Sequence, residues 1–144
     1  MTIRLADDDD KDRWNEFVSK ITDYPCYLYE WKKVLEHVYG YECKYLIAEN
    51  RHKIMGIFPI AVIRSKLFGV RIFSLPFSDY GGPLFASDKA TSAIINSFLE
   101  RLRPLVSQAE YLEVRSMMQR EVKAYLQSSL KEGNIRYVTF ITDL

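Results

Sequence analysis

The chain has 144 residues and a formal net charge of +1, with 20 Lys or Arg against 19 Asp or Glu. This length predicts one domain, and the hydrophobic fraction of 48% is typical of a globular protein. The balanced charge, without a long basic stripe, gives no indication of nucleic-acid binding, so we expect no DNA partner. No apolar run approaches the roughly 18 residues of a spanning helix, and no segment has a signal-peptide pattern, so we expect a cytoplasmic protein without a transmembrane segment.

The cysteines and histidines do not have the spacing of a metal site. Cys26 and Cys43 have no histidine at ligand spacing, and His37 and His52 are scattered. A structural zinc site needs about four ligands, so we expect no metal and two buried or half-buried thiols in a reducing compartment.

The first 40 residues alternate apolar and polar residues at two different periods. Residues 2–6 predict a short strand. Two helices are then expected from apolar residues at helical spacing: Trp14, Phe17, Val18 and Ile21 in the first, which Asp10 or a neighbour caps, and Leu28, Trp31, Leu35 and Val38 in the second. Pro25 separates the helices, and Gly40 is the expected end of the second.

From residue 43 the pattern becomes typical of strands. Strands are predicted over 43–50, 53–65 and 70–75, with Pro59 indicating a bulge or an edge and "KLFG" forming a turn. The C-terminal part predicts a helix beginning at Ser87 or Asp88 that Pro104 kinks or ends, a strand over 109–117, a helix over 119–134 and a strand over 135–144. The expected fold class is α/β (α+β), a mixed, mostly antiparallel twisted sheet flanked by about four helices.

The segment "SLPFSDYGGPLF", residues 74–85, is the clearest candidate site. Gly81 and Gly82 permit positive φ and close backbone approach, and Asp79 can cap local N–H groups. One interpretation is a wide connection between strands. The other is a rigid ledge that lines a cleft and offers Ser78, Asp79 and Tyr80 to a ligand.

Other polar residues also have two interpretations. Glu113 and Arg115 share one face of a strand, where a cross-strand ion pair is their commonest role. Trp31 is either core or a ligand platform. No Ser-His-Asp or Cys-His triad can be assembled, and the candidates for a general base are Asp79, Glu113 or a water held by Tyr80.

The spread "GIFPIAVIRSKLFGVRIFSLPFSDYGGPLF … YLEVRS", together with Trp31, resembles the Fem-like (FemAB-related) acyltransferases of the GNAT superfamily, including members associated with bacterial exopolysaccharide and PEP-CTERM systems. The resemblance runs from about Trp14 to the C-terminus. It implies a GNAT-like fold and an N-terminal domain, residues 1–144, of a longer protein with two tandem GNAT-like domains. It also implies transfer of an acyl or aminoacyl group to an amine of a cell-envelope or polysaccharide-related acceptor.

The chain departs from an ordinary GNAT domain because it has no Arg/Gln-x-x-Gly-x-Gly/Ala loop to bind the pyrophosphate of coenzyme A. We therefore expect no cofactor in this domain, with acyl-coenzyme A or aminoacyl-tRNA as donor for the full protein, which would be active only with its second domain. The acceptor, a small molecule, glycan or peptide, is expected at a cleft lined by Trp31, Ser78, Asp79, Tyr80, Gly81, Gly82, Glu113 and Arg115. The alternatives are a non-catalytic GNAT-like module that supports a partner domain, and a homodimer of the fragment through unpaired sheet edges.

Overall fold

The computed structural model describes residues 1–87 and 91–115. The strands in these residues are β1 (Thr2–Leu5), β2 (Glu42–Cys43), β3 (Leu46–Asn50), β4 (Lys53–Phe58), β5 (Ala61–Ser65), β6 (Gly69–Phe73), β7 (Leu84–Phe85) and β8 (Tyr111–Glu113). The helices are α1 (Lys11–Ser19), α2 (Tyr29–Tyr39) and α3 (Thr91–Val106), with the 3-10 turns η1 (Asp8–Asp10) and η2 (Pro25–Tyr27). The helix predicted over 119–134 and the strand over 135–144 lie outside the described residues.

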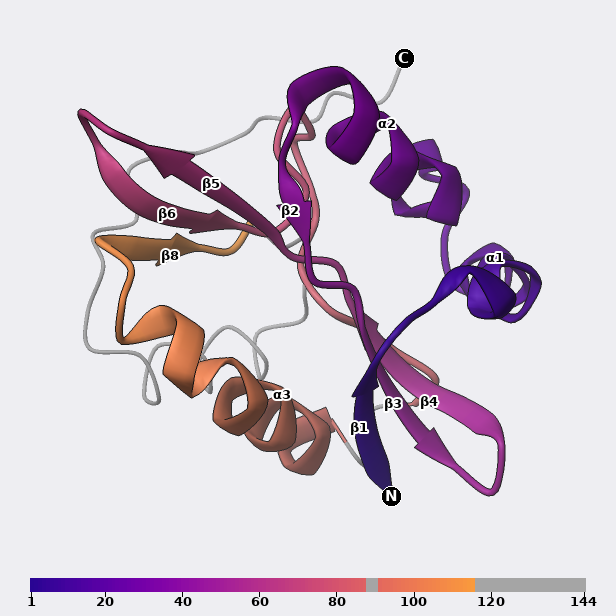
Figure 1. Cartoon of the computed structure of the whole chain (residues 1–144). Coiled ribbons are helices and arrows are strands. Elements are labelled where there is room, and N and C mark those ends of the chain that lie inside the picture. Colours follow the sequence, from indigo (N-terminus) through magenta and orange to yellow (C-terminus); the bar gives the residue numbers. More distant parts are fainter. Residues whose placement is uncertain (88–90, 116–144) are drawn as a thin grey trace, which may run out of the picture.

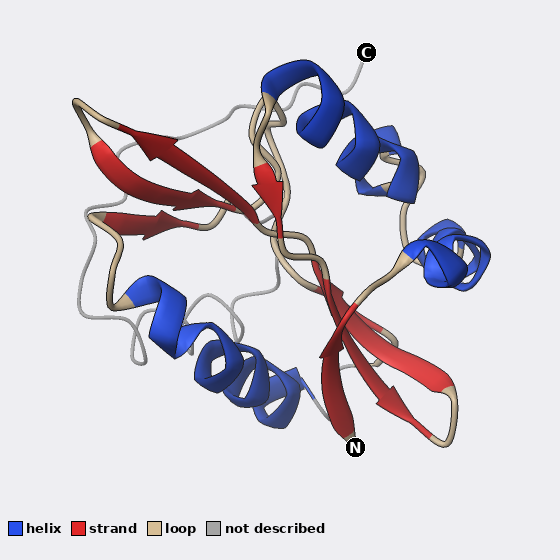
Figure 2. Cartoon of the chain, viewed as in Figure 1, coloured by secondary structure: helices blue, strands red, loops and turns tan. Residues whose placement is uncertain are grey.

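The described strands form two four-stranded sheets, ordered β1-β3-β4-β7 and β2-β5-β6-β8 (Figures 1 and 2). Their pairings are antiparallel except for the neighbouring strands β6 and β8, which run parallel and come before and after α3 in the chain. The predicted mixed, mostly antiparallel strand arrangement is therefore confirmed. A parallel pair needs a crossover connection, and α3 supplies it.

The strands predicted over 43–50 and 53–65 are each divided between the two sheets, which corrects the prediction of unbroken strands. Pro59 lies at the division between β4 and β5, where it has no N–H to donate. The neighbouring N–H of Lys44 donates to the Ile60 carbonyl at 2.7 Å, so the hairpin remains hydrogen-bonded across the division. Pro59 thus marks where the chain passes from one sheet into the other.

The helices cover opposite faces of the strands, with α1 and α2 on one side and α3 on the other (Figure 1). Successive side chains of a strand point to opposite faces, and β3 follows this rule. Ile47 packs in the cluster that contains Trp14, whereas Leu46 packs in the cluster that contains Phe98. Both faces of the first part of β3, residues 46–48, are therefore buried, which explains the apolar run there.

The ends of the first two helices differ in part from the prediction. Gly40 ends α2 with a left-handed φ of 67°, as expected. Ile21 lies beyond α1, and Val38 is 69% exposed, so neither belongs to the buried face to which its spacing assigned it. The last turn of α2 extends past the core it packs on, so helical periodicity there no longer predicts burial.

Within the described residues, none of the helices has the length and apolar character that crossing a bilayer requires.

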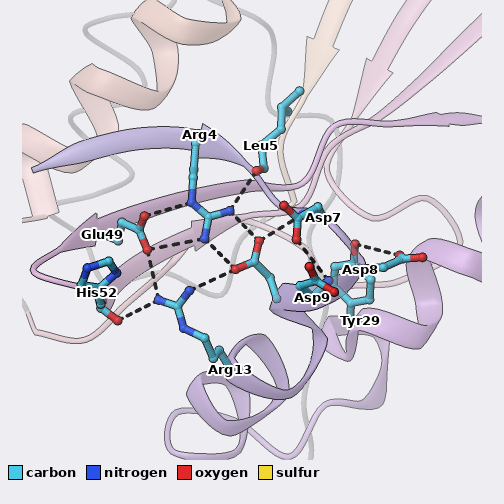
Figure 3. A network of polar contacts seen from close by, with 10 residues as sticks. Arg4, Leu5, Asp7, Asp8, Asp9, Arg13, Tyr29, Glu49 and His52 are labelled. Carbon is cyan, nitrogen blue, oxygen red and sulfur yellow. Dashed lines mark hydrogen bonds and ion pairs between the residues drawn. The ribbon is translucent and has the colours of Figure 1, made fainter.

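A network of charged side chains joins β1, α1 and β3 (Figure 3). Asp10, which is 3% exposed, accepts hydrogen bonds from Arg4 at 2.5 and 2.6 Å and from Arg13 at 3.1 Å. Glu49 accepts from Arg4 at 2.9 Å and from Arg13 at 3.0 Å. The Asp10 carboxylate also accepts from the N–H of Asp7, whose own side chain caps η1. The acidic run near the N-terminus is therefore a capping and anchoring element.

We expect this network to make stability fall in acid. Hydrogen bonds from Arg4 lower the pKa of Asp10 and, together with Arg13, that of Glu49. Since these folded-state pKa values lie below the unfolded ones, the contribution is present above about pH 4.5 and is lost as the pH falls through the folded pKa values. Urea unfolding between about pH 7 and about pH 3 measures the loss. It should be smaller in Asp10→Asn, and an equal loss in this variant would contradict the assignment.

Candidate functional site

The candidate loop connects a strand of one sheet with a strand of the other. Phe73, the last residue of β6, pairs with Ala61, and Leu84, the first residue of β7, pairs with Ile57. Residues 74–83, which we call the SDYGG loop, connect these two strands and thereby pass from one sheet to the other. The backbone of two residues in this loop, Leu75 with φ 48° and Phe77 with φ 65°, is left-handed. Such strain in residues other than glycine persists only where the surrounding structure imposes it.

The two glycines are buried, and their backbone is used inside the protein. The N–H groups of Gly81 and Gly82 both donate to the Arg115 carbonyl at 2.7 Å, and the Gly82 carbonyl accepts from the Tyr27 hydroxyl at 2.8 Å. Neither glycine has a positive φ. This corrects the expectation of a bare backbone ledge: glycine is required here because the chain approaches itself, since a Cβ on Gly81 would lie 2.5 Å from the Ser74 oxygen.

Ser78 and Asp79 exchange the roles expected of them. The buried Ser78 hydroxyl donates to the Tyr80 carbonyl and accepts from the Tyr80 N–H at 3.3 Å, so serine makes the turn-capping bonds predicted for Asp79. The Asp79 side chain is exposed and makes no hydrogen bond or ion pair with another described residue. The loop therefore presents a carboxylate that its own turn does not use.

Two tyrosines lie beside this carboxylate. Tyr80 is half-buried and makes an edge-to-face contact with Tyr24, with ring centroids 5.7 Å apart. Desolvation, and after it the negative charge of Asp79, raises the pKa of the Tyr24 hydroxyl. Tyr24 comes from the segment before α2, in which the sequence indicated only a helix break. Tyr24 and Tyr27 are thus residues of this region that the sequence analysis missed, although the tyrosine-rich run "DYPCYLY" was a visible signal.

Arg115 holds the SDYGG loop in place. Its N–H donates to the Ser74 hydroxyl at 3.1 Å, its carbonyl accepts the two glycine bonds, and its guanidinium donates to the Ser78 carbonyl at 3.1 Å. The same guanidinium pairs with Glu113 at 2.5 Å. This ion pair joins the last residue of β8 to a residue two positions beyond it, contrary to the expected cross-strand pair. Arg115 is therefore next to the candidate site and is bound mainly to the loop itself.

Three further aromatic rings lie at the other end of the loop. The ring of Phe77 is 4.5 Å from that of Tyr39 and 6.2 Å from that of Tyr41, between centroids. Tyr39 and Phe77 are exposed. The outer surface of the SDYGG loop thus consists of Phe77, Asp79 and Tyr80, with tyrosines from the α2 region on both sides.

The structure places the remaining candidates away from a nucleophilic role. Trp31 is half-buried against the cluster around Trp14, and its indole N–H has no hydrogen-bond partner in the described part of the chain. Burial raises the pKa of the Cys43 thiol to about 12, so this thiol is protonated at neutral pH. No group of three or more metal-ligand side chains occurs within residues 1–87 and 91–115.

The connection that leads into α3 contains no glycine. It consists of "ASDKA" between β7 and Thr91, of which residues 88–90 lie outside the described part. A glycine-rich turn that would bring several N–H groups to a pyrophosphate is therefore not encoded here.

Comparison with known proteins identifies the fold. No family model and no curated protein matches the sequence. An aminoglycoside 6'-N-acetyltransferase from Acinetobacter haemolyticus superposes with a TM-score of 0.65 at 14% identity, covering 100% of this chain and 99% of that one. An aminoglycoside N-acetyltransferase solved with coenzyme A gives 0.57 at 11%, covering 99% of each chain. A GNAT family acetyltransferase from Staphylococcus aureus gives 0.53 at 16%, covering 99% of this chain and 97% of that one.

The chain therefore has the fold of the GNAT acetyltransferases, and the predicted fold class is confirmed. At these identities the likeness concerns the fold alone. It extends over essentially the whole length of this chain and of the three structures.

Proposed function

We propose that this chain is an N-acyltransferase domain of the FemAB-like type, which transfers an acyl or aminoacyl group to an amine of a cell-envelope or polysaccharide-related acceptor in the cytoplasm. The observation that carries the proposal is the likeness of the whole chain to N-acetyltransferases. The sequence resemblance around the SDYGG loop supports the finer assignment. A fold alone does not define an activity, so the chemistry must come from the site.

The acceptor amine binds at Asp79 in this proposal. An amine attacks a carbonyl only when it is deprotonated, and the Asp79 carboxylate is exposed, without a partner among the described residues, and flanked by Tyr24 and Tyr80. A cationic amine is attracted both by a carboxylate and by the face of an aromatic ring. Asp79 then takes the proton, directly or through a water, while the tyrosine rings position the acceptor. Ser78, Gly81 and Gly82 are buried beneath this surface, and the half-buried Arg115, paired with Glu113, holds them by hydrogen bonds. Trp31 packs on the cluster that contains Tyr27.

The donor is held with the help of a second GNAT-like domain of the longer protein. The connection into α3 offers no glycine-rich turn for the pyrophosphate of acyl-coenzyme A, and aminoacyl-tRNA is the other candidate donor. In this division of roles the present domain binds and orients the acceptor. Correct positioning alone can lower a barrier by about 7–11 kcal/mol.

A test replaces Asp79 with asparagine in the protein that carries both domains. Acyl transfer from acyl-coenzyme A or aminoacyl-tRNA to an amine-bearing cell-wall precursor should lose about a hundredfold or more in kcat, because a general base contributes about that factor. The melting temperature should stay the same, since Asp79 is exposed. Asp12→Asn, at an exposed position of α1, is the matched control. Unchanged turnover in Asp79→Asn and in Tyr80→Ala would remove the loop from the site.

One observation favours a second candidate, a non-catalytic GNAT-like module that supports a partner domain. Both glycine N–H groups of the SDYGG loop are bonded to Arg115, so the loop backbone offers these donors to no ligand. The same assay decides between the candidates. A structural module predicts equal turnover for all three variants and a loss only when the loop itself is disrupted.

A further inference from the structure

The turn between β5 and β6 exposes two large apolar side chains at its tip. Leu67 is 87% exposed, the highest value for a large apolar residue in the described part of the chain, and Phe68 is 64% exposed. Tips of hairpins are usually occupied by Gly, Asn, Asp or Ser. Figure 1 shows this hairpin reaching to a corner of the molecule, away from the three helices. Leu67 and Phe68 thus lie at the tip of a hairpin that projects from the protein.

The turn holds these side chains outward in a defined geometry. The Ser65 hydroxyl accepts from the N–H groups of Leu67 at 3.3 Å and of Phe68 at 3.2 Å. Gly69 closes the turn with a left-handed φ of 68°. The Arg71 guanidinium lies 5.3 Å from the centre of the Phe68 ring, within reach of a cation–π contact. Hydrogen bonds and the contact with Arg71 therefore fix the conformation of the turn that carries Leu67 and Phe68.

The hairpin is also positively charged. Residues 61–73 contain Arg64, Lys66 and Arg71 and no acidic residue. Arg64 pairs with Glu42 at 3.1 Å, whereas Lys66 and Arg71 form no ion pair with a described residue. Glu110 is an acidic neighbour, whose carboxylate oxygen would lie 2.9 Å from a Cβ on Gly69. Lys66 is exposed, whereas Arg71 is half-buried beside Phe68 with its Nε buried, so Lys66 is the cation next to the apolar tip that is most available to an external anion.

We propose that the β5–β6 turn is a membrane-surface contact. Leu67 and Phe68 enter the boundary between headgroups and acyl chains of an anionic bilayer, and the exposed Lys66 binds a lipid phosphate, with the half-buried Arg71 adding positive charge behind it. Apolar side chains beside basic ones are what an anionic bilayer surface selects. Two projecting side chains are too few for a protein interface, which buries about 800 Å² on each partner. This inference is independent of the proposed acyl transfer and concerns where the protein works.

The test is co-sedimentation of the 144-residue chain with phosphatidylcholine vesicles that contain or lack phosphatidylglycerol. We expect binding to the anionic vesicles that weakens when salt is raised from about 0.1 M to about 0.5 M. The double variant Leu67→Ser/Phe68→Ser should bind at least about tenfold more weakly, and Lys66→Glu about tenfold more weakly. The matched control, Val38→Ser/Tyr39→Ser, changes exposed apolar residues elsewhere and should bind like the wild type.

Three outcomes would overturn the proposal. The first is absence of binding to anionic vesicles, and the second is binding that the Leu67→Ser/Phe68→Ser change leaves intact. The third is a dimer in light scattering that this variant dissociates, without vesicle binding, since the turn would then join two copies of the chain. Acyl transfer to an amine in vesicle-free buffer is measured separately, in the protein that carries both domains. The Leu67→Ser/Phe68→Ser change should leave it equal to that of the wild type, so failure of this proposal is separate from failure of the proposed function.

Discussion

Replacing Gly81 with alanine is expected to lower the free energy of unfolding by about 3 kcal/mol. The added Cβ would lie 2.5 Å from the Ser74 carbonyl oxygen and 2.6 Å from the Cβ of Leu75, distances that side-chain rotation cannot relieve. The SDYGG loop would then have to move away from β6 and weaken the two glycine bonds to Arg115. Urea unfolding followed by circular dichroism measures the loss.

Gly40→Ala is the matched control for this prediction. Gly40 is left-handed with φ 67°, but a Cβ there has no neighbour within 4 Å. Its replacement should cost only the strain of a left-handed alanine, about 1 kcal/mol. If Gly81→Ala were no more destabilising than Gly40→Ala, the self-contact of the loop would not be what requires glycine at position 81.

Replacing Asp10 with alanine is expected to cost about 2 kcal/mol. Asp10 is 3% exposed and binds two guanidinium groups, Arg4 and Arg13, so its removal leaves two cations close together with Glu49 as their remaining partner. Breaking a fully buried pair costs about 3–5 kcal/mol. The Arg4 side chain is 30% exposed, and solvent screening reduces that figure.

Glu16→Gln provides the comparison, since Glu16 pairs with Lys20 on the exposed surface of α1. Such a fully exposed pair contributes little to stability because solvent screens it. Equal losses in Asp10→Ala and Glu16→Gln, measured as free energies of unfolding, would show that the network in Figure 3 does not anchor β1 to α1 and β3.

Local patterns predicted most of the elements because each pattern reports a local property. Apolar spacing located α1 and α2, and glycine located the end of α2 at Gly40. The same spacing was wrong for Val38, which is exposed. Periodicity shows which residues share a helix face, but the length of the neighbouring layer decides how much of that face is buried.

The SDYGG loop likewise shows which features of the candidate site a local pattern predicts and which depend on distant segments. Two adjacent glycines indicated a close backbone approach, and one occurs at Gly81. The sequence did not reveal that the approaching chain is the loop itself, or that Arg115 takes both glycine N–H groups. These bonds join segments more than thirty positions apart in the chain, and no local pattern records such a distance.

The sequence by itself determined the helices α1 and α2, the mixed α/β class and a close backbone approach at the glycines, because propensity and periodicity act over a few residues. Only the tertiary structure decided that Ser78 is used within its turn while Asp79 is exposed, and that Tyr24 joins Tyr80 beside it. It also decided how the long strands divide between two sheets. The reason is physical: burial and hydrogen-bond satisfaction depend on which distant segments pack together, and the energies of those contacts outweigh local preference.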